Sequence, residues 1–161
     1  AFRLMVDREG EPLYDLAQAN LLLSFGLDWL QAHPSPVEAS RAYGWLRQGR
    51  GDRRVRIVQV EPRLSMTAAK SDEWIPIQPG QEGWLALGIA HVLIRERRFR
   101  DQLAQNSVGL EPFARFVASH AAPEAVAGRT GVPPETIQRL AKEFGVSQQV
   151  IAHQLQNHSL A

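Results

Sequence analysis

The run Leu21-Leu22-Leu23-Ser24-Phe25-Gly26 is almost entirely apolar and ends at a glycine. Such a run is typical of a short β-strand that is buried on both faces, as strands in parallel sheets are. A second strand is expected over residues 55–60, which are rich in β-branched side chains and stop at Pro62. Between the two runs, a loop precedes apolar residues whose spacing predicts a helix over residues 36–47. Strand, crossover helix and strand make the βαβ unit of a parallel sheet.

The rest of the chain continues this alternation. Residues 74–77 are expected to form a short third strand, at a sheet edge or beside a bulge because of Pro76. A long apolar helix is predicted from Pro79-Gly80 to Arg100, and shorter helices over residues 15–20, 111–120, 123–128 and 133–144. Residues 146–152 fit either a strand or a helix. We therefore expect an α/β fold, a Rossmann-like parallel sheet with flanking helices, in a single domain over residues 1–161.

The composition of the chain excludes several kinds of site and partner. The 161 residues contain no cysteine, which excludes disulfides, thiolate nucleophiles and iron–sulfur ligands from this sequence. A net charge of +1 does not indicate a polycation built for nucleic acid. No apolar run approaches the ~18 residues of a membrane span, and neither a P-loop nor a Gly-x-Gly-x-x-Gly motif is present. The absence of an initiating methionine leads us to expect a piece of a longer protein.

Parallel α/β sheets bind ligands beyond the carboxyl ends of their strands. After the first predicted strand, Gly26 lets a backbone approach a phosphate, and Asp28 and His33 add polar groups in the same loop. Glu61 follows the second strand, where a carboxylate can accept hydrogen bonds from ribose hydroxyls or a base edge. The segment Gly80-Gln81-Glu82 opens the long helix and offers backbone N–H groups with a carboxylate. All of these could equally be turn or capping residues, so spacing alone leaves nucleotide binding open.

Several stretches around these positions resemble the molybdopterin oxidoreductases of the dimethyl sulfoxide reductase superfamily. They are Leu23-Ser24-Phe25-Gly26, Val58-Gln59-Val60-Glu61-Pro62-Arg63-Leu64-Ser65-Met66-Thr67-Ala68, the segment from Asp72 to Leu87, Gly109-Leu110-Glu111-Pro112-Phe113, and the segment from Thr130 to Ala141. The likeness runs in order over residues 15–145. This sequence has glutamate in its Glu-Pro-Arg and Pro-Gly-x-Glu-Gly motifs, together with Ser-x-Thr. In these motifs it looks closest to polysulfide or tetrathionate reductase-like subunits and to subunits of quinone-linked respiratory complexes.

The resemblance implies a fragment of a large subunit, the domain that grips one molybdopterin guanine dinucleotide of the molybdenum cofactor. Carried over by position, Gly26, Asp28 and His33 would line the diphosphate and pterin. Glu61 and Arg63 would sit at the guanosine ribose, and Gly80, Gln81 and Glu82 at the guanine edge. The family usually shows Asp at the positions of Glu61 and Glu82, and often Asn at that of Asp28. The domain would bind and orient the cofactor without a catalytic residue of its own, so that alone it should be inactive.

The resemblance also implies partners. These are the remaining domains of the parent subunit, and the iron–sulfur and membrane subunits of a bacterial respiratory complex at the periplasmic or cytoplasmic face of a membrane. Neither nucleic acid nor direct membrane insertion is expected. The residue that ligates molybdenum belongs to family segments upstream of this one.

Three other interpretations stay open. One is a cofactor-free structural relative within a respiratory complex, and another is an independent nucleotide-binding module. The third is a helix-turn-helix over residues 140–155, which would present Gln148, Gln149 and His153 to DNA but is only weakly basic. Seven arginines between Arg41 and Arg63 could grip an anion, Arg63 first among them, or form a solvated face or docking surface.

Overall fold

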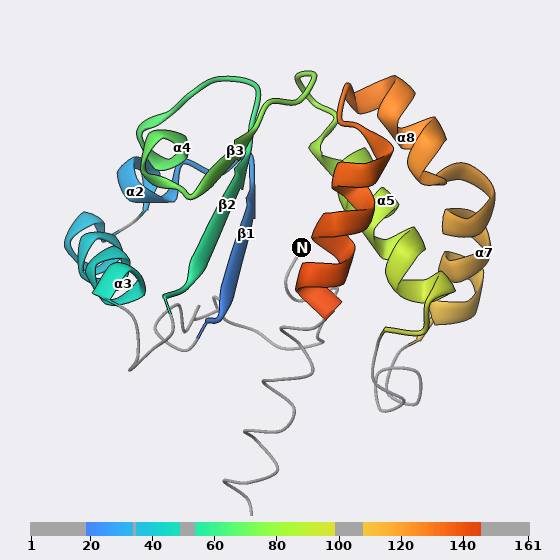
Figure 1. Ribbon diagram of the computed structural model, residues 1–161, viewed down its shortest axis with the longest axis horizontal. Helices are drawn as coiled ribbons and strands as arrows, with labels where there is room; N and C mark the ends of the chain where they lie inside the picture. The colour runs from blue at the N-terminus through green and yellow to red at the C-terminus, as the bar shows by residue number, and fades with distance from the viewer. Residues whose placement is uncertain (1–18, 34, 49–53, 99–107, 146–161) are drawn as a thin grey trace, which may run out of the picture.

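The computed structural model describes residues 19–33, 35–48, 54–98 and 108–145. Its strands form one parallel sheet in the order β1 (Leu21–Phe25), β2 (Arg56–Val60) and β3 (Glu73–Ile75). Helices cover both faces of the sheet (Figure 1). They are α2 (Trp29–Ala32), α3 (Pro36–Gln48), α4 (Met66–Lys70), α5 (Glu82–Arg95), α7 (Leu110–His120), α8 (Pro123–Thr130) and a last helix over residues 134–145. The predicted Rossmann-like α/β class is confirmed.

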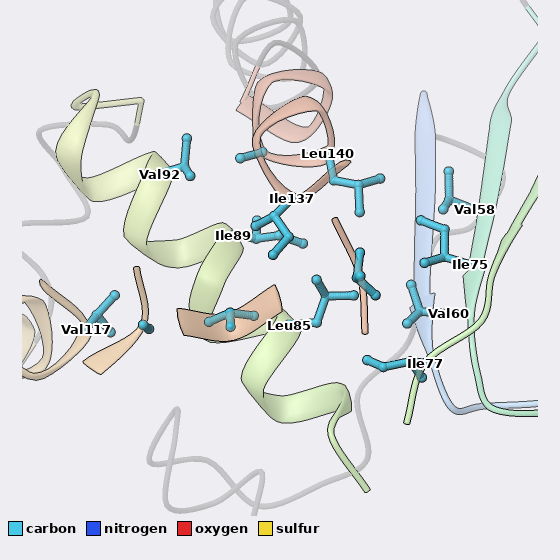
Figure 2. Close-up of a cluster of buried hydrophobic side chains, with 14 residues drawn as sticks. Val58, Val60, Ile75, Ile77, Leu85, Ile89, Val92, Val117, Ile137 and Leu140 are labelled. Atoms are coloured by element: carbon cyan, nitrogen blue, oxygen red, sulfur yellow. The ribbon is translucent and has the colours of Figure 1, made fainter. Parts of the chain in front are cut away.

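Alternate residues of β2 point to opposite faces and so supply two separate cores. Val58 and Val60 belong to the core shared with α5 and the last helix, part of which is drawn in Figure 2. Ile57 belongs to the core on the other face, with Trp29, Ala39 and Leu46 of α2 and α3. Side chains of both β1 and β2 pack against both cores, which explains why the two strands are rich in apolar residues.

Close packing around α5 depends on a residue without a side chain. A Cβ at Gly88 would lie 3.1 Å from Val126 Cγ1 and 3.3 Å from Ile137 Cγ2. Neither neighbour is a flexible side-chain end, since both are branched residues of the core. Gly88 therefore lets α5 approach both α8 and the last helix.

Some local features differ from the sequence predictions. The expected loops contain two short helices, α2 and α4. Helix α4 is capped by Ser65, whose hydroxyl accepts a hydrogen bond from the Ala68 N–H. Strand β3 ends one residue before Pro76, which has no N–H to give to a sheet. Helix α5 ends at Arg95 rather than Arg100. Most of the predicted 15–20 helix, and all of residues 146–152, lie outside the described residues.

An ion-pair cluster around Asp72 ties the amino end of β3 to the rest of the sheet. Its carboxylate accepts hydrogen bonds from Arg47 at 2.7 Å, Arg54 at 2.8 Å and the Ile57 N–H at 2.8 Å. Partial burial acts to raise the pKa of Asp72, but the Ile57 N–H and the two guanidinium groups lower it by more. The pKa of this carboxyl therefore lies below its usual range.

A second cluster joins the sheet to the last helix. Glu73 accepts hydrogen bonds from Arg56 at 2.6 Å and from both terminal nitrogens of Arg139, at 2.5 and 3.1 Å. Arg139 also donates to Glu143, one turn further along its helix, at 3.0 Å. Three of the seven arginines singled out in the sequence, Arg47, Arg54 and Arg56, thus pair with carboxylates at the amino ends of the strands, away from the carboxyl ends. None of the helices in the described part of the chain is long and apolar enough to cross a membrane.

Candidate functional site

The carboxyl ends of β1 and β2 meet at Gly26. Its N–H donates a 2.8 Å hydrogen bond to the carbonyl of Val60, the last residue of β2. The φ angle of Gly26 is 67°, in the left-handed region that favours glycine. A Cβ at Gly26 would lie 3.8 Å from Cγ and Oε1 of Glu82, at the start of α5. The fold therefore brings two of the predicted site residues, Gly26 and Glu82, side by side.

The peptide group between Leu27 and Asp28 is held in one orientation. The Leu27 carbonyl accepts hydrogen bonds from Gln59 Nε2 at 3.1 Å, from Ser24 Oγ at 3.3 Å and from the Trp29 N–H at 2.9 Å. Because C=O and N–H of a trans peptide point in opposite directions, the Asp28 N–H points away from the buried Gln59. Within the described residues, neither this N–H nor that of Leu27 has an acceptor. Successive free N–H groups after a left-handed residue form the concavity that binds anions in many proteins.

The Asp28 carboxylate is turned toward α4. Its Oδ1 accepts a 2.5 Å hydrogen bond from the hydroxyl of Thr67, which in turn accepts from the Leu30 N–H at 3.1 Å. Its Oδ2 lies 3.9 Å from Nη2 of Arg63. The side chain of Asp28 is only 12% exposed, whereas that of Arg63 is 79% exposed. The negative charge of Asp28 is thus partly neutralised within the loops, and the guanidinium of Arg63 remains open to solvent.

Glu61 is buried, with 3% of its surface exposed. Its Oε1 accepts from the Ser65 N–H at 3.0 Å and its Oε2 from Gln59 Nε2 at 3.2 Å. Its backbone carbonyl accepts from Trp74 Nε1 at 3.0 Å. Both carboxylate oxygens are therefore occupied inside the protein: Oε1 holds the loop before α4, and Oε2 holds Gln59 of β2, which in turn holds the Leu27 carbonyl. The Oε1 of Gln59 is buried and has no hydrogen-bond partner among the described residues.

The other predicted residues lie in turns. His33 follows α2, and its Nδ1 is 3.0 Å from the Ser35 N–H, within the same turn. Gly80 has a φ angle of 76°, and a Cβ there would meet nothing within 4 Å, so the turn is open on that side. Gln81 caps α5 through its carbonyl, which accepts from the N–H groups of Trp84 and Leu85. Within the described residues, the hydrogen bonds of His33 go to Ser35 and not to Gly26 or Glu82.

Gln59, Ser65 and Thr67 organise this site, and the sequence analysis gave none of them a role. A signal for Gln59 was present, because it is polar within an apolar strand and lies two residues before Glu61, on the same face. Ser65 and Thr67 belong to a motif that carried the resemblance, but their partners come from distant or backbone groups. The helix-turn-helix alternative cannot be placed in the fold: residues 146–161 lie outside the described residues, and residues 140–145 belong to the last helix.

The assembled groups suit a ligand that carries both anionic oxygens and hydrogen-bond donors. Free N–H groups and Arg63 can contact the anionic oxygens, while Glu82 can accept from N–H or hydroxyl groups. Among the described residues, no group of three or more His, Asp or Glu side chains could hold a metal ion.

Sequence comparison finds relatives along most of the chain. The profile of the molybdopterin oxidoreductase family matches residues 8–130. The arsenate respiratory reductase molybdopterin-containing subunit ArrA of Shewanella sp. is 32% identical, over 83% of this chain and 18% of that protein. The menaquinone reductase molybdopterin-binding-like subunit of Nitratidesulfovibrio vulgaris is 31% identical over the same shares. The chain thus spans about 18% of the length of these curated relatives.

Structural comparison agrees on the fold. Acetylene hydratase from Pelobacter acetylenicus superposes with a TM-score of 0.65 over 79% of this chain and 17% of that one, at 24% sequence identity. The family match covers the loops after all three strands, and it confirms the resemblance seen in the sequence. A role in binding a molybdenum cofactor follows at the level of the family. This chain belongs to the molybdopterin oxidoreductase family.

Proposed function

We propose that this chain is one domain of a molybdopterin-dependent oxidoreductase and that it binds one guanine dinucleotide of the molybdenum cofactor. The observation that carries the proposal is the fixed Leu27–Asp28 peptide, which turns the Asp28 N–H outward beside Gly26. A diphosphate is the part of the dinucleotide that such N–H groups recognise. Gly26 leaves room for it, and the exposed Arg63 guanidinium adds a charged contact.

Glu82 is the residue of this chain best suited to the guanine edge. Guanine presents two neighbouring donors on its Watson–Crick edge, and one carboxylate can accept from both. Glu82 lies in the first turn of α5, close to Gly26, so one ligand could reach both residues. Gly80 and Gln81 form the turn that leads to Glu82. In this proposal Glu61 acts on the ribose side only indirectly, because it holds in place the loop that carries Arg63. His33 would lie toward the pterin.

The residues present fit such a group, because they offer a cation, a carboxylate and N–H groups with no acceptor among the described residues, all around a glycine. When bound, the molybdenum cofactor supplies the redox chemistry, and the protein supplies binding and orientation. We infer that the parent protein is an oxidoreductase that works with iron–sulfur and membrane subunits. The isolated domain would bind a nucleotide without turning over a substrate.

Calorimetric titration of the chain with GDP, and separately with ADP, tests the proposal. GDP should bind more tightly than ADP, because adenine lacks the paired donors that Glu82 would accept from. Arg63→Glu should weaken GDP binding about tenfold or more, since it places a negative charge beside the diphosphate. Arg115→Glu, a matched change on the exposed face of α7, should leave the affinity unchanged. A folded chain that does not bind GDP contradicts the proposal.

A cofactor-free structural role is the second candidate. Two observations favour it: both Glu61 oxygens are occupied inside the protein, and one relative is described only as molybdopterin-binding-like. In that case the loops would keep their internal hydrogen bonds, and GDP would not bind. The same titration separates the two candidates.

A further inference from the structure

A stacked pair joins the end of α8 to the start of α5. The guanidinium carbon of Arg129 lies 4.1 Å from the centroid of the Trp84 ring, a distance at which the positive charge is attracted to the ring face. Arg129 is in the last turn of α8, and Trp84 is in the first turn of α5, two residues after Glu82. Within the described residues, no carboxylate lies within ion-pair distance of Arg129. The Trp84 ring is therefore the contact that holds this guanidinium.

A hydrogen bond joins the same two regions next to this pair. The Gln78 N–H donates to the Thr130 carbonyl at 3.0 Å. Thr130 is fully buried, and its hydroxyl donates to the Val126 carbonyl at 2.8 Å and accepts from the Val132 N–H at 3.1 Å. The carbonyl that receives Gln78 is thus firmly placed.

In the loop between β3 and α5, Ile77 is anchored in the core, but the residues after it make few contacts of their own. Gly80 is in the left-handed region with open space around it, and Gln81 makes no side-chain cap to α5. The backbone of the loop makes one hydrogen bond within the turn, from the Gln81 N–H to the Gln78 carbonyl at 3.1 Å. The contacts with α8, which packs along α5 in Figure 1, therefore help to set where residues 78–82 lie.

We propose that Arg129 is a positioning residue for the nucleotide site: stacked on Trp84 beside the Gln78–Thr130 hydrogen bond, it sets the position of the β3–α5 loop and hence of Glu82. This inference rests on the proposed function, in which Glu82 reads the guanine edge. It assigns guanine selectivity in part to α8, a helix about 40 residues further along the chain and outside the set of residues proposed to contact the nucleotide.

The first test measures the affinities for GDP and ADP of the wild type, Arg129→Ala, Trp84→Leu and the double variant. Each single change should weaken GDP binding about fivefold, the change that a lost partly exposed cation–π contact gives, and should affect ADP less. The double variant should be no weaker than the singles, because both remove one interaction. Arg129→Lys keeps the charge and should restore part of the GDP preference. Arg115→Ala, on α7, is the control and should change nothing.

The second test follows amide hydrogen exchange without nucleotide. Arg129→Ala should speed exchange at the Gln78 and Gln81 N–H groups severalfold, and leave Val92 in the middle of α5 unchanged. Unchanged exchange in the loop overturns the positioning role. So does an Arg129→Ala variant that binds GDP with wild-type affinity and selectivity, or one that loses affinity for both nucleotides only in proportion to lost folded protein. If the wild type fails to bind GDP while exchange still speeds up, the proposed function fails, and what stands is that Arg129 places the β3–α5 loop.

Discussion

The hydroxyl of Thr67 donates a 2.5 Å hydrogen bond to Oδ1 of Asp28, 39 residues earlier in the chain. This bond joins the loop after β1 to the first turn of α4. The same oxygen of Thr67 accepts from the Leu30 N–H, so a single side chain ties together both loops that flank the proposed diphosphate position.

Replacing this hydroxyl should weaken both the fold and the site. Thr67→Val keeps the shape of the side chain but leaves the Leu30 N–H without an acceptor and Asp28 without its donor. We expect a loss of about 1–2 kcal/mol in the free energy of unfolding, measured in urea, and weaker GDP binding. Thr136→Val, in the last helix, is the control and should cost little. A Thr67→Val chain as stable as the wild type would show that the bond contributes nothing.

Gln59 holds the Leu27 carbonyl, and its loss should affect the ligand more than the fold. Gln59→Leu is similar in size and removes the donor to both Leu27 and Glu61, while it also removes the unpartnered Oε1. These effects on stability partly cancel, so we expect a destabilisation of about 1 kcal/mol. GDP affinity should fall severalfold, because the Leu27 carbonyl loses one of its three hydrogen bonds and the Leu27–Asp28 peptide is held less firmly. Calorimetry at matched folded fraction checks this, and unchanged affinity would mean that the peptide is held by other contacts.

Two glycines of α5 should respond in opposite directions to the same substitution. Gly88→Ala gains about 1 kcal/mol of helix propensity but forces a methyl group against Val126 and Ile137, which costs about 1–3 kcal/mol in packed cores. We expect a net loss of stability. Gly83→Ala meets nothing within 4 Å and should be neutral or stabilising by up to about 1 kcal/mol. Thermal unfolding of the two variants and the wild type measures these changes in stability. A Gly88→Ala variant that is more stable than the wild type would disprove the close packing of α5.

Asp72 makes the stability of the chain depend on pH. Its pKa is lowered in the folded protein, so its contribution is fully present above the unfolded value of about 4, and it is lost as pH falls through the folded pKa. Asp72→Asn should therefore destabilise by about 1 kcal/mol at pH 7, and the difference from the wild type should shrink below pH about 4. Urea unfolding at pH 7 and pH 3 measures this. Glu124→Gln on the exposed face of α8 is the control, and a difference independent of pH would contradict the ion-pair account.

The sequence was most informative where structure follows from local pattern. The apolar run at residues 21–26 predicted β1, and the β-branched residues over 55–60 predicted β2, because strands covered on both faces are rich in such side chains. Helix α4 was not predicted, since five residues are too few to display a helical period. Strand β3 was predicted to begin one residue late and to end two residues late; it stops before Pro76, which has no N–H to give to a sheet.

Part of the site could also be predicted from the sequence, because the expected sheet topology places its loops together. Loops after parallel strands converge by topology, so Gly26 and Glu82 could be expected near one another. The burial of Glu61 could not, because it depends on donors from Gln59 and the Ser65 backbone. The stacking of Arg129 on Trp84 joins residues 45 positions apart and has no local signature.

The most direct test of the central claim is a titration of the 15N-labelled chain with GDP, followed through the backbone N–H signal of Asp28. This N–H is the group that the fixed Leu27 carbonyl turns outward, so it should shift in a saturable way, with a smaller response to ADP. The N–H of Gly88, within α5 and away from the loops, should not move. A saturable shift at Asp28 supports nucleotide binding at the carboxyl edge of the sheet, whereas an Asp28 signal that stays in place at saturating GDP contradicts it.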